Sequence, residues 1–548
     1  MGVVQIIVFC AVLLAIVPLL GGYMARVYTS ERIRPVERLV LKLLRVEPAS
    51  QTWKTYAASV VLFSLVSWLL LYLILRTQTA HPFNPNGFNS GTWDLSFNTV
   101  SSFVTNTNWQ FYGGETTLSY FSQMAGLAVQ NFVSAAVGIT VLIALIRGIA
   151  SKPLGNFWQD LTRTVMYVLL PISVVGALLL ASQGVVQSLS DWGPVASQEI
   201  IKLLGTNGGG FFNVNSAFPY ENPNGFTNFV EMLAMLAIPA SLTYTYGRMV
   251  GSRRQGWTVF GVMFTVFVIG VVAVYLAESS VTPAQQAAGL TGANLEGKEL
   301  RFGTGGTALW TVVTTATSTG AVNAAFESLT GIGGLIPMVN LGFGESIFGG
   351  VGTGLYTMLL YVLLAVFIGG LMVGRTPEYL GKKLEAREIK LVVLALLATP
   401  LLVLVTTSLA LGTGHGGPSI YASGPQGFSE TLYAYLSQAN NNGSAFAGYT
   451  GYLQPEAGNL GANGVTFADL LGGLTMLIGR FVPIVLTLAL AGAMRNKRAA
   501  PAGLGTMRTD TPTFAGLTVG TVVIVGALTF LPAFLLGPVV QGLTTQLF

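Results

Sequence analysis

Long apolar stretches separated by polar segments run along the whole chain. A helix that crosses a bilayer needs about 20 mostly apolar residues. Ten stretches meet this requirement and predict ten transmembrane helices, at residues 3–25, 57–75, 125–146, 164–185, 229–247, 257–277, 346–373, 389–411, 466–494 and 515–540. The pattern therefore predicts an all-α polytopic membrane protein.

Four shorter, moderately apolar stretches lie between these spans, and each ends in a run of small polar residues, usually with glycine. The stretches are 94–105, 195–205, 308–317 and 428–439. The runs are Thr105-Asn106-Thr107-Asn108, Gly205-Thr206-Asn207-Gly208, Thr317-Ser318-Thr319-Gly320 and Asn440-Asn441-Asn442-Gly443. Their recurrence in corresponding segments indicates an internal repeat of span, short helix, polar loop and span.

The repeat divides the chain into four tandem membrane–pore–membrane units, with one extra transmembrane helix at each end. We expect the units to surround a filter with pseudo-four-fold symmetry. The expected parts are a first helix with a basic cytoplasmic loop (1–56), pore units 57–146, 147–247, 248–373 and 374–494, and a cytoplasmic loop with the last helix (495–548).

Composition narrows the protein class further. Only 9% of the residues are charged, against roughly 25% in a soluble domain, and the hydrophobic fraction is 52%. So few charges exclude a cytosolic enzyme, a nucleic-acid binder and a disordered protein. The single cysteine, Cys10, excludes a disulfide framework and a cysteine-based metal site.

The basic residues are distributed unevenly between the two sides of the predicted membrane. One set of connecting segments carries 22 Lys and Arg and the other carries 4. The rich set is 26–56, 147–163, 248–256, 374–390 and 495–514. The positive-inside rule puts this set in the cytoplasm and both termini outside. Since the cytoplasmic segments are too short for a nucleotide-binding domain, we do not expect this chain to hydrolyse ATP by itself.

The external loops suggest a chemistry. Non-helical backbone at membrane depth is tolerated where it lines a wet cavity or is buried in protein. Four such loops around one axis present rings of carbonyl oxygens, which replace the hydration shell of a monovalent cation such as K⁺. One Asn-Gly loop alone reads as an ordinary external turn, but four corresponding loops favour a pore. The GTGGT segment at 303–307 lacks the Lys-Ser/Thr of a phosphate loop and is interpreted as a flexible turn.

Specific strings carry a resemblance to a known family. They are VTNTNWQFYGGETTLSYFSQMAGLAVQNF (104–132), KLLGTNGGGFFNVNSAFPYENP (202–223), TTATSTGAVNAAFESLT (314–330) and QANNNGSAFAG (438–448). Over its whole length the chain resembles the KdpA family, the potassium-binding subunits of the bacterial Kdp potassium-transporting P-type ATPase. That family belongs to a superfamily with the channel-like Trk, Ktr and HKT proteins. The extra spans and large external loops of this chain resemble the KdpA family more than those other members.

The resemblance implies a division of labour within a complex in the bacterial inner membrane. This subunit would capture extracellular K⁺ and pass it through an intramembrane tunnel to KdpB, which would bind and hydrolyse ATP. KdpC and KdpF are the other implied partners, with the lipid bilayer around them. K⁺ is the transported ion, and no organic cofactor is expected.

The resemblance and the loops together nominate the site residues. The filter residues are Asn106, Thr107, Asn108, Thr206, Asn207, Gly208, Ser318, Thr319, Gly320, Asn441, Asn442 and Gly443. We expect them to coordinate K⁺ mostly through backbone carbonyls. Gln110 resembles a family position at the outer mouth, and a hydrogen bond that braces the loop is an equally good interpretation.

Two features on the inner side are candidates for a barrier or gate. Arg480 lies in the middle of a span, where a charge costs about 2.5–3.5 kcal/mol to insert. It serves either as a positive barrier that diverts K⁺ sideways or in a structural role, as an ion pair or as a hydrogen bond to a broken helix. Gly349, Gly350 and Gly352 allow either close helix packing or a discontinuous, gating helix.

Two alternatives from other classes remain at this point. In the first, the chain would be a stand-alone Trk/Ktr-like potassium channel or symporter. In the second, it would be a membrane scaffold. The four filter-like loops count against a scaffold. Potassium flux through the isolated chain separates a channel from a pump subunit.

Overall fold

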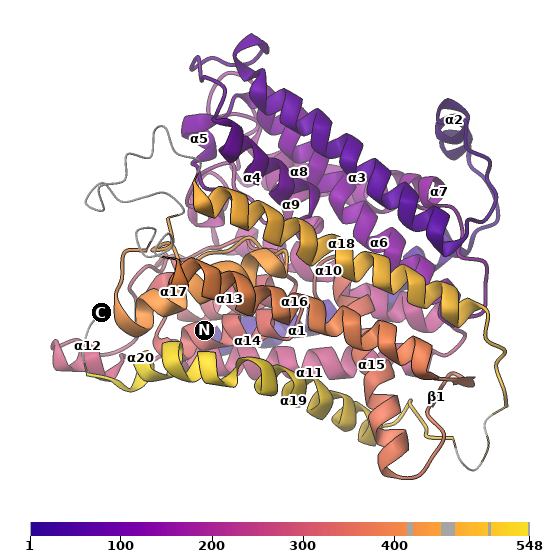
Figure 1. Cartoon of the computed structure of the whole chain (residues 1–548). Coiled ribbons are helices and arrows are strands. Elements are labelled where there is room, and N and C mark those ends of the chain that lie inside the picture. The colour runs from indigo at the N-terminus through magenta and orange to yellow at the C-terminus, as the bar shows by residue number, and fades with distance from the viewer. Residues whose placement is uncertain (1, 414–419, 451–465, 502, 504–505, 546–548) are drawn as a thin grey trace.

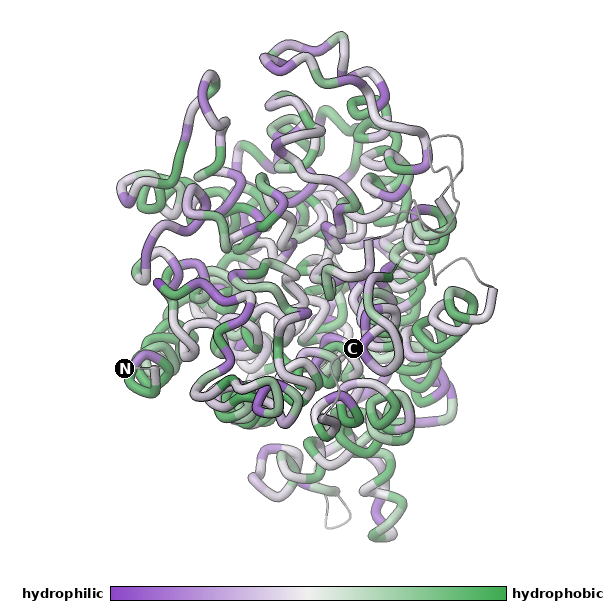
Figure 2. The backbone as a smooth tube through the Cα atoms, turned by 90° about the vertical axis from the view of Figure 1, so that its left-hand side faces the viewer, coloured by the Kyte–Doolittle hydropathy of each residue, from purple (hydrophilic) through white to green (hydrophobic). Residues whose placement is uncertain are grey.

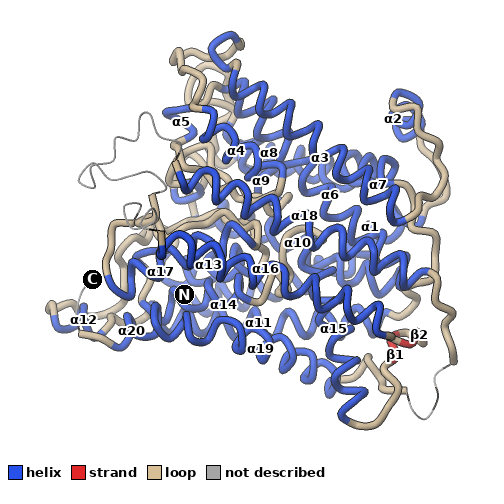
Figure 3. Tube along the Cα trace, in the orientation of Figure 1, coloured by secondary structure: helices blue, strands red, loops and turns tan. Residues whose placement is uncertain are grey.

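The computed structural model describes residues 2–413, 420–450, 466–501, 503 and 506–545. Ten helical segments of the described chain are long and apolar enough to cross a membrane, as predicted. Figure 1 shows most of them side by side in one bundle, and Figure 3 shows that helices make up most of the chain.

The helices follow one another along the chain with short connections. Those before the third unit are α1 (Gly2–Thr29), α2 (Pro35–Leu43), α3 (Trp53–Arg76), α4 (Trp93–Val104), α5 (Gly114–Thr117), α6 (Val129–Ile149), α7 (Phe157–Arg163), α8 (Leu170–Ser182), α9 (Val195–Leu204) and α10 (Gly225–Met249). Those of the third and fourth units and the C-terminal part are α11 (Arg253–Glu278), α12 (Pro283–Ala287), α13 (Gly303–Ala316), α14 (Gly331–Gly342), α15 (Thr353–Met372), α16 (Ala386–Gly412), α17 (Gly424–Ala439), α18 (Phe467–Arg495), α19 (Pro512–Phe534) and α20 (Val540–Leu543).

Wider π-helical turns continue three of the spans, at Ser122–Ala128 before α6, Thr164–Leu169 between α7 and α8, and Leu535–Val539 after α19. Short 3₁₀ turns occupy Gln78–Ala80, Asn215–Ala217 and Phe326–Ser328. Strands β1 (Glu378–Tyr379) and β2 (Lys382–Lys383) form one antiparallel hairpin, with Glu378 opposite Lys383.

The four predicted short stretches are the helices α4, α9, α13 and α17. Each packs against both spans of its own unit: α4 against α3 and α6, α9 against α8 and α10, α13 against α11 and α14, and α17 against α16 and α18. Contacts of α18 with α6, α6 with α9, α10 with α13 and α15 with α16 join neighbouring units. The units therefore form a closed ring.

The two extra helices lie outside this ring. Helix α1 packs along α10, and α19 packs on α11 and α15. Figure 1 places the N-terminus and α20 at the same end of the bundle, which agrees with an even number of spans. Figure 2 views that end, where hydrophilic segments cross between the green, hydrophobic helices.

In the third unit, the span predicted at 346–373 begins later than expected. A short apolar helix, α14, comes first, and the transmembrane helix α15 begins only at Thr353. Between them, Glu345 and Phe348 join three glycines in left-handed backbone conformations that no α-helix can hold. The span is therefore discontinuous, and the glycines produce a break as well as close packing.

A second correction concerns residues 303–307. They form the first turn of α13 and are not a flexible turn. Gly305 and Gly306 have no side chains, so this turn can lie directly against α1. A Cβ at Gly305 would collide with the backbone of Gly2. Small side chains here serve helix packing.

Candidate ion-binding site

The four predicted filter loops leave their helices through the same hydrogen bond. In each loop, the N–H of the second filter residue donates to the carbonyl of the helical residue five positions earlier. The pairs are Thr107 to Ser102 at 2.9 Å, Asn207 to Lys202 at 2.7 Å, Thr319 to Thr314 at 2.8 Å, and Asn442 to Ser437 at 2.8 Å. The internal repeat inferred from the recurring polar runs is therefore also present in the backbone geometry.

The backbone conformation of the loops is also shared. The first and third filter residues are left-handed in all four, with φ of 72° and 57° at Asn106 and Asn108, 49° and 87° at Thr206 and Gly208, 49° and 87° at Ser318 and Gly320, and 52° and 97° at Asn441 and Gly443. Glycine adopts this conformation freely, and Asn is the side chain that tolerates it best. Alternation of handedness turns successive peptide carbonyls to one side of the chain, which is the geometry a carbonyl-lined site needs.

Each loop touches the next one around the ring. A Cβ added at Gly208 would overlap the Thr319 carbonyl, one at Gly320 would overlap the Asn442 carbonyl, and one at Gly443 would overlap the Thr107 carbonyl. The three glycines are thus required both by φ and by close approach of the neighbouring loop.

Side-chain hydrogen bonds complete the ring. Asn106 Nδ2 donates to the Thr206 carbonyl at 2.8 Å, which connects the first and second loops. Asn441 Nδ2 donates to Thr107 Oγ1 at 2.9 Å, which connects the fourth and first. Side-chain amides therefore connect the first loop to the loops on both sides of it.

The second filter residues carry the strongest chemical signal. Thr107, Asn207, Thr319 and Asn442 are each 0% exposed. Among the described residues, none donates a hydrogen bond to any of their four carbonyl oxygens. Since nearly all buried backbone carbonyls are paired, four unpaired oxygens on adjoining loops are suited to a dehydrated monovalent cation.

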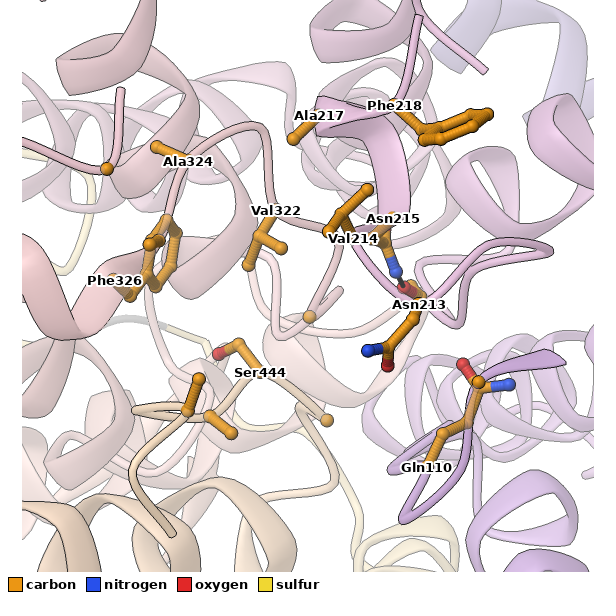
Figure 4. A pocket seen from close by; sticks show the side chains of 18 of the residues that line it. Gln110, Asn213, Val214, Asn215, Ala217, Phe218, Val322, Ala324, Phe326 and Ser444 are labelled. Atoms are coloured by element: carbon orange, nitrogen blue, oxygen red, sulfur yellow. Dashed lines mark hydrogen bonds between the residues drawn. The ribbon is translucent and has the colours of Figure 1, made fainter. Parts of the chain in front are cut away.

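A large cavity opens on one side of the ring. Its volume is about 880 Å³, and its lining includes the third residues of the four loops, Asn108, Gly208, Gly320 and Gly443. Figure 4 shows Gln110, Asn213, Val322 and Ser444 arranged around this cavity, one from each predicted unit. The third residue of each loop is therefore the one nearest to this mouth cavity.

Gln110 lies between the first and second loops. It lines the mouth cavity, and its Oε1 accepts from Gly210 N–H at 2.9 Å while its Nε2 donates to the Gly210 carbonyl at 3.3 Å. The paired bonds brace the first loop against the second. Gln110 acts here as a clamp at the cavity wall.

A buried ionic cluster behind the second loop was missed by sequence reasoning. Lys202, 0% exposed, lies 2.6 Å from Glu199 and 2.7 Å from Glu221, and its Nζ also donates to Asn215 Oδ1 at 3.0 Å. Asn215 Nδ2 in turn donates to the Gly208 carbonyl at 2.7 Å. The cluster thus fixes the orientation of the outermost carbonyl of this loop.

One signal for this cluster was present in the sequence. Ser102, Thr314 and Ser437 occupy the position that Lys202 holds in the second unit, so Lys202 alone brings a charge there. A lysine in an apolar helix beside a filter needs buried partners. Its partners Glu221 and Asn215 could not be identified from spacing, because a loop brings them back to the helix.

The break before α15 contacts the second and third loops directly. Val351 N–H donates to Thr206 Oγ1 at 2.8 Å, and Gly349 N–H donates to the Ala316 carbonyl at 2.7 Å. Gly350 N–H faces the carboxylate of Glu345 at 3.4 Å. The Gly349–Gly352 segment therefore forms the floor beneath the second and third loops.

Arg480 lies beside this floor. It is 3% exposed, and its Nη1 donates to Thr353 Oγ1 at 2.7 Å, at the start of α15. A Cβ at the preceding Gly479 would meet the carbonyl of Ala439, the last residue of α17, so α18 packs closely on the end of α17 here. The buried guanidinium is bonded to the start of α15, and its role as a barrier stays a prediction.

A narrow side cavity of about 30 Å³ lies next to Glu345 and Thr353. It runs between α15, α16 and α18, and Tyr356, Thr399 and Pro483 are among its lining residues. Ala439 and Asn440, at the end of α17, also line it.

Lys382 of the β hairpin connects two spans by hydrogen bonds. Its Nζ donates to the Gly148 carbonyl at 2.9 Å and to the Met494 carbonyl at 2.7 Å, at the ends of α6 and α18. Burial lowers the pKa of Lys382 to about 8. An ammonium at helix C-termini is favourable, and here it joins the first unit to the fourth.

Comparison with known proteins agrees with this architecture. The family model described as potassium-transporting ATPase A subunit, KdpA, matches residues 7–543. A potassium-transporting ATPase potassium-binding subunit of Rhizobium rhizogenes is 50% identical over 99% of this chain and 98% of its own length. The subunits of the same name from Sorangium cellulosum (50%, 99% of each chain) and Brucella anthropi (49%, 99% and 98%) are similarly close.

Proposed function

The chain belongs to the KdpA family of potassium-transporting ATPase A subunits, and we propose that it is the potassium-binding subunit of an ATP-driven potassium uptake pump. The observation that carries this proposal is the ring of four adjoining loops with buried, unpaired carbonyls at Thr107, Asn207, Thr319 and Asn442. K⁺ is the transported substrate.

In this proposal, K⁺ enters the mouth cavity from outside and loses its water to the filter loops. Neutral backbone oxygens replace hydration without binding the ion too tightly to release, which conduction requires. The twelve filter residues nominated from the sequence supply these oxygens, and Gln110 holds the mouth in shape. The four C-terminal ends of the pore helices point toward the ring and favour a cation.

Below the ring, Arg480 acts as a positive barrier and K⁺ turns sideways. The floor formed by Gly349–Gly352 blocks a straight path, and the side cavity beside Glu345 and Thr353 is the beginning of the tunnel toward a partner subunit. A charge in a low-dielectric region repels a cation more strongly than it would in water. Arg480 therefore opposes leak.

The proposal assigns ATP to a partner. A KdpB-like P-type ATPase subunit binds and hydrolyses ATP, and KdpC-like and KdpF-like subunits complete the complex, so this chain is not an enzyme on its own. The complex lies in the bacterial inner membrane, with both termini of this chain outside and its basic segments in the cytoplasm. Residues 57–146, 147–247, 248–373 and 374–494 are the four pore units.

Reconstitution tests the proposal against its closest alternative. The chain alone and the chain with its ATPase partner are placed in liposomes, and K⁺ uptake is measured with and without ATP. We expect uptake only from the complex and only with ATP. Rapid K⁺ flux through the chain alone would instead favour a stand-alone channel, and ion-coupled uptake would favour a symporter.

A further inference from the structure

Helix α2 lies in the basic segment between α1 and α3 and is set apart from the bundle in Figure 1, near the end where α3 begins. Only one side of it contacts the protein. Glu37 and Leu41 are buried against α7, where Glu37 Oε2 accepts from Arg163 Nε at 3.1 Å and from Gln159 Nε2 at 2.8 Å. The helix is therefore firmly docked, and its other sides are open.

The open surface separates into an apolar and a basic stripe. Val36, Leu39 and Leu43 follow helical spacing along one side and are 37%, 56% and 73% exposed. Arg38 and Lys42 are also exposed and follow helical spacing on a neighbouring side, between the apolar stripe and the buried residues. Such a helix is suited to a boundary between an apolar and an aqueous phase.

The position of α2 along the bundle matches a membrane boundary. Its contact residue Arg163 lies six residues after Phe157, the first residue of α7, which is about 9 Å along a helix axis. Trp158 on α7 and Trp53 at the start of α3 lie at the same end, and tryptophan is enriched at membrane interfaces. The headgroup layer of one leaflet has a thickness similar to the distance from Phe157 to Arg163 along the helix axis.

Charge decides which occupant the apolar stripe takes. The segment 26–56 carries seven basic residues, and one of its three acidic residues, Glu37, is already bonded to Arg163. Basic clusters on amphipathic helices beside a transmembrane span attract the anionic lipids of the cytoplasmic leaflet. An apolar protein partner would require no flanking row of cations.

We propose that α2 is an interfacial helix that inserts Val36, Leu39 and Leu43 into the cytoplasmic leaflet and binds anionic phospholipid headgroups through Arg38, Lys42 and the following Arg45. The orientation of this surface rests on the proposed function, which puts the basic segments in the cytoplasm. The lipid contact holds the docked helix, and with it α7, at a fixed depth in the membrane.

Cysteine labelling of the reconstituted complex tests this proposal. In a Cys10→Ala background, Leu39→Cys on the apolar stripe and the neighbouring Arg38→Cys on the basic stripe each receive an environment-sensitive NBD label. The vesicles contain phosphatidylcholine or phosphatidylglycerol with brominated acyl chains. We expect strong quenching and a blue shift at position 39, weak quenching at 38, and stronger quenching by brominated phosphatidylglycerol than by brominated phosphatidylcholine.

A charge variant isolates the headgroup contact. With Arg38, Lys42 and Arg45 all changed to Gln and the label at position 39, we expect the preference for phosphatidylglycerol to fall to a ratio near one. Equal, weak quenching at both label positions would overturn the proposal. A blue-shifted but unquenched label at position 39 would also overturn it and would indicate a protein partner. K⁺ uptake by the same vesicles reports separately on the proposed function.

Discussion

Substitution of Gly208 by Ala is the sharpest perturbation of the proposed filter. Gly208 has φ of 87°, and a Cβ there would lie far inside the 3.0 Å that Cβ atoms keep from neighbours such as the Thr319 carbonyl oxygen. The change adds one methyl group and no charge. It acts on the contact between the second and third loops.

The size of the effect follows from two contributions. A left-handed conformation costs an L-residue about 1–2 kcal/mol. The overlap also displaces the Thr319 carbonyl by about 1 Å, and a misplacement of that size is large for a binding group. The ion-free ring relieves the overlap by opening, whereas bound K⁺ needs it closed. A total of about 2–3 kcal/mol lowers K⁺ affinity about 30- to 140-fold.

The assay is a K⁺ binding isotherm of the purified protein, followed by K⁺-dependent transport in the complex. Gly225→Ala is the matched control, since a Cβ there meets nothing within 4 Å and its backbone is not left-handed. The Gly208→Ala protein must elute and melt like the wild type for the comparison to hold. A well-folded Gly208→Ala protein with unchanged K⁺ affinity would refute the filter assignment.

Three further predictions concern the surroundings of the filter. Arg480→Gln keeps a donor for Thr353 but removes the charge, so ATP-independent K⁺ flux in liposomes should rise about tenfold or more, whereas Arg480→Lys should stay tight. Asn215→Gly keeps the left-handed backbone but loses the bond to the Gly208 carbonyl, so K⁺ affinity should fall about fivefold, for about 1 kcal/mol, in the same isotherm. The Lys382 pKa is about 8 folded against 10.5 unfolded, so between these values the unfolded chain binds the extra proton and stability rises with pH. The melting temperature of the wild type should therefore rise relative to that of Lys382→Met between about pH 7.5 and pH 9.5. An unchanged difference between the two melting temperatures would contradict the titration of Lys382.

Much of the fold is predictable because bilayer thickness dictates helix length. Hydropathy locates all ten spans, since an apolar run long enough to cross a membrane has few alternative structures. It misplaces the start of the span in the third unit because α14 and the break before Thr353 are both apolar and glycine-rich, so hydropathy does not mark where the helix stops. The glycines allow a break there, and the left-handed backbone of residues such as Glu345 and Phe348 shows it.

The filter loops are predictable for a conformational reason. Left-handed positions favour glycine or asparagine, which occupy six of the eight in these loops, with Thr206 and Ser318 as the exceptions, so their spacing is visible in the sequence. The support behind the loops is not visible there, because Glu221 and Asn215 reach Lys202 through a loop. Likewise, the basic segment 26–56 is predicted as a loop, although the apolar and basic residues of α2 follow helical spacing.

Anomalous scattering from Rb⁺ or Tl⁺ bound to the protein tests the central claim most directly, since both ions replace K⁺ in carbonyl sites. We expect a peak on the axis of the ring, within coordinating distance of the carbonyls of Thr107, Asn207, Thr319 and Asn442. A peak that occurs only elsewhere, or no peak at a saturating ion concentration, would contradict the account.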